Sequence, residues 1–146
     1  MVVVLARPAF TLGAMSDYKN LQVWQKAHAL ALHAHRTAMA VRATRYSALR
    51  SQIIRSAMSV PANIVEGRRQ ESERDFARFL RYALNSVYEL EYHVTLARDI
   101  EVIQDEDASA LIAEGVEVRK MLHGLLKKIG LPTQPPPDVS KSKTPV

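Results

Sequence analysis

Cysteine is absent from the sequence, and glycine occurs only five times among 146 residues. The missing cysteine excludes structural disulfides, thiolate metal sites and a cysteine nucleophile. It also fits a reducing compartment, so we expect a cytoplasmic protein. The chain has neither a glycine-rich phosphate loop nor a Gly-x-Ser-x-Gly elbow. Nothing in the sequence therefore identifies a reaction, and we predict that the protein is not an enzyme.

Long apolar runs are also missing. A bilayer span needs roughly 20 consecutive apolar residues, and no stretch reaches that length, so we expect no membrane partner. The N-terminal segment lacks a basic region ahead of a sustained apolar stretch, which argues against a secretory signal. Because Met15 directly precedes a natural helix entry, residues 1–16 are predicted to be disordered or a mis-annotated extension. Met1 and Met15 both stay open as the start of translation.

Positive charge exceeds negative charge. The chain has 20 Lys and Arg against 15 Asp and Glu, a formal net charge of +5 and a pI of about 9.7. This balance is compatible with a polyanionic partner such as RNA or DNA, and equally with a mildly basic soluble protein that has none. Hydrophobic residues make up 47% of the chain, and a chain of 146 residues is long enough to bury the core of one domain.

Apolar residues recur at the spacing of a helix face in four segments joined by short links. The first segment spans about residues 21–41, and Asp17 or Asn20 is the expected capping residue. The second begins near Tyr46 and ends near Gly67, a plausible helix stop. Short links make consecutive helices antiparallel neighbours.

The third and fourth segments show the clearest periodicity. Ser72 opens the third in a sequence resembling a capping box, and it ends near Asp99. Asp105 is the expected cap of the fourth, which ends at Gly130. The apolar residues alternate steps of four and three: Phe76, Leu80, Ala83, Val87, Leu90, Val94 and Ala97 in the third segment, and Ala108, Leu111, Gly115, Val118, Leu122, Leu125 and Ile129 in the fourth.

The four segments together predict one architecture. We expect an all-α, antiparallel up-down-up-down four-helix bundle over residues 17–130. The remaining residues, 131–146, are rich in proline and are predicted to form a disordered tail.

A row of polar residues accompanies the apolar face of the second segment: Gln52, Ser56, Ser59, Asn63 and Glu66. Buried polar groups fix the register between helices when each finds a partner. We therefore predict that this row makes polar contacts with another helix or another subunit. Pro61 lies in the same stretch and is expected to bend the helix, because it removes one backbone donor.

A second row lies opposite the apolar face of the third segment: Arg74, Arg78, Arg81, Asn85, Tyr88 and Tyr92. Arginines pair with phosphates and tyrosines stack on bases, so this row is the candidate nucleic-acid surface. Arg68 and Arg69 add charge just before it, whereas acidic residues of the same segment dilute the charge. The row also fits a solvated face or a subunit interface, where tyrosine and arginine are enriched.

Histidine spacing argues against a metal site. His28 and His35 lie about 10 Å apart along a helix axis, and the i, i+4 spacing that presents two imidazoles on one face is missing. The Glu-x-x-His pattern of di-iron bundles is also missing. We expect neither a metal nor another cofactor.

Four stretches resemble a bacterial family of small four-helix-bundle proteins. They are residues 18–27 (YKNLQVWQKA), 46–57 (YSALRSQIIRSA), 59–67 (SVPANIVEG) and 76–91 (FARFLRYALNSVYELE). This family includes proteins encoded in intervening sequences of 23S rRNA genes, and the accessory variability protein of diversity-generating retroelements is related to it. The resemblance covers roughly residues 17–129. Asn85 departs from it, standing where the family is expected to have glycine.

The resemblance carries its own expectations. It implies a homo-oligomer, with a pentamer as the expected state, and no enzyme activity. It implies nucleic-acid binding for some members, and for this chain the expected partners are RNA or DNA and a nucleic-acid enzyme to which it is accessory. Two functions follow for this chain: a cytosolic assembly that binds RNA or DNA through basic surfaces, and a structural or protein–protein interaction assembly with no nucleic-acid role.

Overall fold

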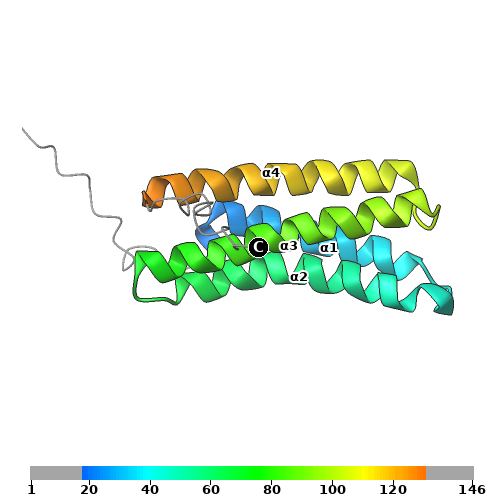
Figure 1. Cartoon of the computed structure of the whole chain (residues 1–146), viewed down its shortest axis with the longest axis horizontal. Coiled ribbons are helices and arrows are strands. Elements are labelled where there is room, and N and C mark those ends of the chain that lie inside the picture. The colour runs from blue at the N-terminus through cyan, green and yellow to red at the C-terminus, as the bar shows by residue number, and fades with distance from the viewer. Residues whose placement is uncertain (1–17, 131–146) are drawn as a thin grey trace, which may run out of the picture.

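The computed structural model describes residues 18–130, and within them the chain forms four α-helices and no strand (Figure 1). The helices are α1 (Gln22–Ala40), α2 (Ser47–Arg68), α3 (Glu73–Asp99) and α4 (Asp105–Ile129). They lie side by side along the long axis of the molecule, so the predicted all-α four-helix bundle is confirmed. The predicted N-terminal extension (1–16) and Pro-rich tail (131–146) lie outside the described residues.

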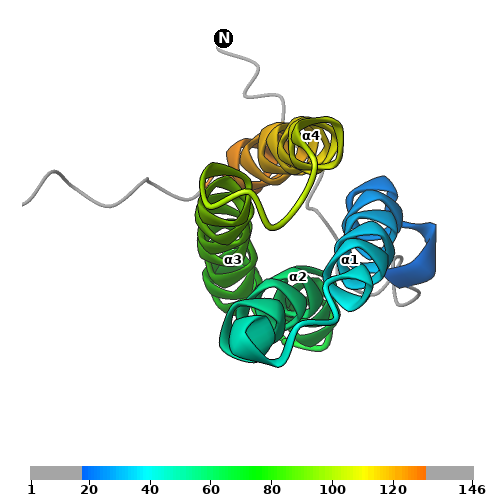
Figure 2. The same ribbon diagram turned by 90° about the vertical axis from the view of Figure 1, so that its right-hand side faces the viewer.

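Consecutive helices pack against one another around a shared core, as the view along the bundle axis shows (Figure 2). α2 and α3 share the most extensive contact, whereas α1 and α4, which close the bundle, share the least of the neighbouring pairs. Within residues 18–130, none of the helices combines the length and apolarity needed to cross a membrane.

The apolar face predicted for the third helix forms the centre of the core. All seven of its residues, from Phe76 to Ala97, are buried in the structure. Ser72 caps the helix as predicted, because its Oγ accepts a hydrogen bond from the Asp75 amide at 3.1 Å. With this face fixed inward, the opposite face of α3 is turned to solvent along its length.

Two predicted caps differ in the structure. α1 begins after a short 3-10 turn, Tyr18–Asn20, and the residue at its N-cap is Leu21, which has no side-chain cap. α4 begins with Asp105 as its first helical residue rather than its cap, and no side-chain cap is formed there either. Asp105 still favours the helix start, because a negative charge in the first turn complements the helix dipole. Gly130 ends α4 as predicted, with φ of 70° in the left-handed region.

The second helix ends within one residue of the predicted position, but Gly67 lies inside the helix and is not its cap. α2 runs unbroken through Pro61 and past Gly67 to Arg68. Gly67 is buried against α3, where a Cβ on it would lie 2.9 Å from Cδ2 of Phe76 and 3.0 Å from Cβ of Phe79. This glycine therefore allows a close approach of α2 to α3, and it does not terminate the helix.

Candidate nucleic-acid interface

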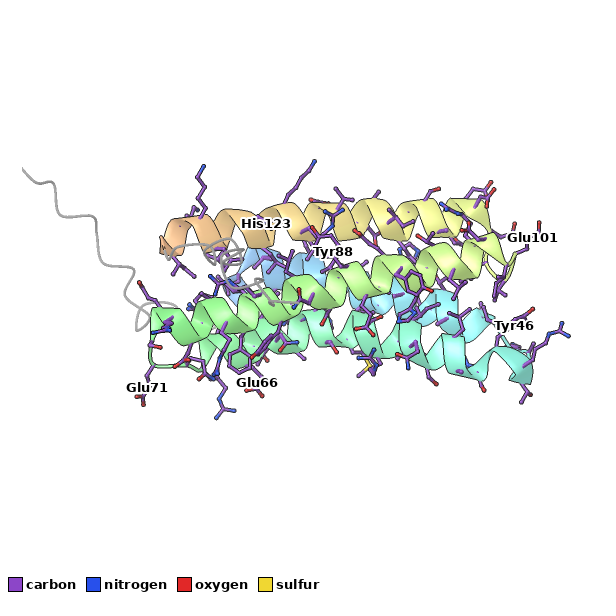
Figure 3. All side chains as sticks on the ribbon, viewed as in Figure 1. Tyr46, Glu66, Glu71, Tyr88, Glu101 and His123 are labelled. Atoms are coloured by element: carbon purple, nitrogen blue, oxygen red, sulfur yellow. The ribbon has the colours of Figure 1, made fainter. Side chains whose placement is uncertain are left out.

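The predicted row of α3 residues lies on one exposed face of the bundle. Its side chains project opposite the buried face because both rows repeat every seven residues, half a helix turn apart. Tyr88 is 48% exposed and Tyr92 is 62% exposed, which is high for aromatic side chains. Figure 3 shows Tyr88 on α3 at the edge that faces α4. The row thus presents arginines near the start of α3 and tyrosines toward its end.

Ion pairs neutralise most of the carboxylates that flank this row. Arg78 pairs with Asp75 at 3.4 Å within α3. Glu89 pairs with Arg55 of α2, and Glu91 pairs with Arg119 of α4 at 2.9 Å. In the part of the chain that the structure describes, Arg74 and Arg81 form no ion pair. Arg74 is exposed and Arg81 is half-buried, and no carboxylate of the described residues neutralises either charge, although the sequence suggested that acidic neighbours dilute them.

Arg119 of α4 holds Tyr88 in place. Its guanidinium carbon lies 4.7 Å from the centroid of the Tyr88 ring, and its Nη1 donates to the Tyr88 hydroxyl at 3.4 Å. Arg119 Nε also donates to Glu91 Oε1 at 2.9 Å. This hydrogen bond is the main cause that raises the pKa of Arg119 above its usual value. Tyr88 is therefore oriented by a cation from the neighbouring helix.

Gly115 of α4 gives this network its space. A Cβ at Gly115 would lie 3.1 Å from Oε1 of Glu91, so any larger residue would push that carboxylate away. The apolar spacing of the fourth segment predicted the position of Gly115, but it gave no sign of the role of Arg119. Arg119 is 31 residues from Tyr88 along the chain, and no local spacing connects the two.

Arg68, predicted as part of the nucleic-acid surface, is buried instead. The residue is only 8% exposed, and Nε, Nη1 and Nη2 are each buried without a hydrogen-bond partner. Its guanidinium lies over the Phe76 ring, 5.3 Å from the centroid, and burial lowers the pKa of Arg68. Arg68 is therefore removed from the candidate surface, whereas its neighbour Arg69 is exposed.

The unpartnered guanidinium of Arg68 should reduce the stability of the fold. We expect Arg68→Met to raise the free energy of unfolding by about 1–2 kcal/mol, because methionine keeps the packing on Phe76 and removes a buried charge with unsatisfied donors. Urea titration followed by circular dichroism measures this change. Arg69→Met is the matched control and should stay within about 0.5 kcal/mol of the parent. A loss of stability in Arg68→Met alone would show that the guanidinium has an acceptor in solution.

The polar row of α2 bonds within its own helix. Ser56 Oγ donates to the Gln52 carbonyl at 2.7 Å, Ser59 Oγ to the Arg55 carbonyl at 2.8 Å, and Asn63 Nδ2 to the Ser59 carbonyl at 2.8 Å. Gln52 and Glu66 are exposed. Among residues 18–130, the predicted polar contacts of this row with another helix of the same chain are therefore wrong. Contacts of the row with another subunit stay a prediction.

A shallow apolar groove lies on the outer side of α2. It is lined by Ser51, Ile54, Arg55, Met58, Ser59 and Ala62. Met58 is 57% exposed, an unusual position for a large apolar side chain in a helix that already buries its opposite face. The sequence did not predict this groove, because Ile54 and Met58 belong neither to the apolar face nor to the polar row of α2.

Two histidines of α1 contact neighbouring side chains in this bundle. His33 of α1 lies 3.0 Å from Glu114 of α4, which joins the two least-packed neighbouring helices. His28 stacks on Trp24 with ring centroids 4.9 Å apart. No group of three or more metal-ligating side chains that could hold an ion occurs among the described residues.

Comparisons with known proteins identify relatives of the chain. The profile of a family described as 23S rRNA-intervening sequence protein matches residues 19–124. The fold is also similar to a crystal structure from Bacteroides thetaiotaomicron, described as a protein with unknown function from the S23 ribosomal protein family. That match has 28% sequence identity and a TM-score of 0.68, and it covers 72% of this chain and 98% of the other. No curated protein matches the chain.

Proposed function

This chain belongs to the 23S rRNA-intervening sequence protein family, and from that premise we propose that it is a non-enzymatic, homo-oligomeric protein that binds nucleic acid. The proposed contact surface is the exposed row of α3, formed by Arg74, Arg78, Arg81, Tyr88 and Tyr92, with Arg69 beside it. We name this set the α3 row. Family membership confirms the resemblance seen in the sequence motifs, while the binding activity is our proposal.

One observation carries the proposal: the α3 row combines arginines without a carboxylate partner and exposed tyrosines on a single face. Arg74 and Arg81 form no ion pair among residues 18–130, and the carboxylates Glu89 and Glu91 are held by arginines of other helices. Exposed guanidinium groups bind phosphate oxygens in a forked geometry. A face of this composition attracts a polyanion over a distance set by the salt concentration.

The binding itself is tested by fluorescence anisotropy. Labelled RNA and duplex DNA are titrated with the protein at salt concentrations from 50 to about 300 mM. We expect binding that weakens steeply with salt, because each phosphate contact releases condensed counterions. A complete lack of binding at the lowest salt concentration, where electrostatic attraction is strongest, contradicts the proposal.

The groove on α2 supports the homo-oligomeric part of the proposal. Met58 and Ile54 form an apolar surface with small residues on either side, which permits close approach of another helix. We propose that a second copy of the chain covers this groove, and a pentamer is the state expected for the assembly. The neighbouring α2 polar row would then lie at the edge of the same interface.

Replacing Met58 with glutamate tests this interface. We expect Met58→Glu to lower the solution mass, measured by light scattering, because a buried charge without a partner costs several kcal/mol. Met39→Glu on α1, where the methionine is similarly exposed, is the matched control and should leave the mass unchanged. An unchanged mass in Met58→Glu would show that α2 does not form the contact between copies.

A second candidate function is a structural or protein–protein interaction assembly without a nucleic-acid role. The exposure of Tyr88 and Tyr92 beside the arginines of α3 favours it, because tyrosine and arginine are also enriched in protein interfaces. Under this alternative the α3 row packs between subunits or against another protein, and RNA binding is absent at every salt concentration.

A further inference from the structure

We propose that Tyr88 and Tyr92 form a base-stacking platform that directs the α3 row to single-stranded nucleic acid. This inference rests on the proposed function and specifies its ligand class. Under this proposal the row recognises unpaired bases. The arginines of the first half of α3 bind the phosphates, and the tyrosines of the second half stack on the bases.

The chemistry of the exposed side chains distinguishes single strands from duplexes. In a duplex the faces of the bases are covered by their neighbours, so an exposed tyrosine has nothing to stack on except at an end. An arginine row alone binds both forms through phosphates. Two exposed tyrosines in line with that row add a contribution that only unpaired bases can use.

The spacing along α3 suits a short single strand. Arg74 and Arg81 are about 10 Å apart along the helix axis, and Tyr88 lies another 10 Å beyond Arg81, given a rise of 1.5 Å per residue. The whole row from Arg74 to Tyr92 extends over about 27 Å. At 3.4 Å per nucleotide, this length corresponds to about eight nucleotides of a stacked strand. Phosphates and bases of one strand can therefore contact both halves of the row.

The contact between Arg119 and Tyr88 prepares one end of the platform. The Arg119 guanidinium covers one face of the Tyr88 ring, yet Tyr88 is still 48% exposed. A base stacks on the uncovered face, and the fixed ring loses little conformational freedom on binding. The charge of Arg119 is balanced by Glu91 at 2.9 Å, so Arg119 acts as a positioning residue and does not itself hold a phosphate.

Tyr92 forms the other half of the platform, one turn further along α3. Its ring lies at an angle of 56° to the His93 ring, with centroids 5.5 Å apart. At 62% exposed it is the most open of the large hydrophobic side chains on the described surface. Tyr82 is also exposed, but it lies off the row toward α2, where its ring packs edge-on against Phe79 at 5.5 Å. This difference in position makes Tyr82 a matched control.

The experiment compares one RNA in two forms. A labelled 12-nucleotide RNA without self-complementarity is used alone and annealed to its complement, and both are titrated with the parent protein and its variants by anisotropy. The variants are Tyr88→Ala/Tyr92→Ala, Tyr88→Phe/Tyr92→Phe and Tyr82→Ala. Circular dichroism and light scattering establish that each variant keeps its helicity and its oligomeric state.

We expect the double alanine variant to bind the single strand about 25-fold or more weakly, since stacking contributes about fivefold or more per base. Its affinity for the duplex should change by less than about twofold. The double phenylalanine variant keeps both rings and should bind the single strand like the parent. Tyr82→Ala should also behave like the parent, because its ring lies outside the row.

Four results would overturn the platform. Equal losses for both RNA forms, or no loss for either, would show that the tyrosines do not read unpaired bases, and the proposed function would survive if charge reversal of the arginines still abolished binding. A loss in Tyr82→Ala as large as in the double alanine variant would show that the row is wrongly assigned. A fall in solution mass of the double alanine variant would assign the tyrosines to a contact between copies of the chain.

Discussion

Replacing Arg74, Arg78 and Arg81 together with glutamate is expected to abolish nucleic-acid binding. Arg74 and Arg78 are exposed and Arg81 is half-buried on the same face of α3, and among the described residues only Arg78 has a carboxylate partner, Asp75. Removing three phosphate contacts should reduce the slope of the logarithm of the binding constant against the logarithm of the salt concentration by about 2 for a single strand. Adding three carboxylates to the same face also repels the phosphates, so affinity at 100 mM salt should fall by about 100-fold or more, measured by anisotropy.

A charge-matched variant separates the local surface from the net charge. Arg36, Arg42 and Arg45 are exposed on α1 and in the link that follows it, away from the α3 row. Each Arg→Glu change removes one positive charge and adds one negative charge, so both triple variants go from a formal net charge of +5 to −1. We expect the Arg36/Arg42/Arg45 variant to lose affinity only modestly. Equal losses in the two variants would show that net charge, rather than the α3 row, attracts the nucleic acid.

The oligomeric state of the same variant decides between the two candidate functions. If the α3 row binds nucleic acid, the triple variant keeps the solution mass and the helicity of the parent. If the row instead packs between subunits, three carboxylates without partners split the assembly, and light scattering shows a smaller mass. Binding that survives the triple change in an intact oligomer would place the nucleic-acid surface elsewhere on the molecule.

Gly67→Val is expected to lower the free energy of unfolding by about 2–3 kcal/mol. The Cβ alone would lie 2.9 Å from Cδ2 of Phe76, a distance shorter than a normal contact. Phe76 is fully buried in the core, so its ring cannot turn away without disturbing α2 and α3, the most extensively packed pair of helices. Overpacking of this kind typically costs 1–3 kcal/mol. Urea unfolding followed by circular dichroism measures the loss.

Gly124→Ala is the matched control, because a Cβ at Gly124 has no atom within 4 Å. Alanine has a higher helix propensity than glycine, so this change within α4 should raise the free energy of unfolding by about 0.5–1 kcal/mol. The two glycines thus predict changes of opposite sign. Equal stability of Gly67→Val and the parent would show that α2 and α3 are further apart in solution than in the structure.

The sequence alone determined the fold class and the direction in which each helix faces. Seven apolar residues of α3 at steps of four and three are all buried, from Phe76 to Ala97. This outcome follows from local physics, because the period of a helix and the burial of apolar surface fix which side turns inward. The same period fixed the position of the α3 row, and local signals marked two helix ends correctly: the capping side chain of Ser72 and the left-handed backbone of Gly130.

Only the tertiary structure decided what each polar residue meets. Arg68 and Arg69 are neighbours in the sequence with the same side chain, yet one is buried on Phe76 and the other is exposed. Arg119 holds Tyr88 across two helices, and Gly67 allows α2 to approach α3 where the sequence indicated a helix stop. These contacts join residues that are distant in the chain. They depend on how the helices are rotated and how closely they pack, which the period of a single helix does not specify.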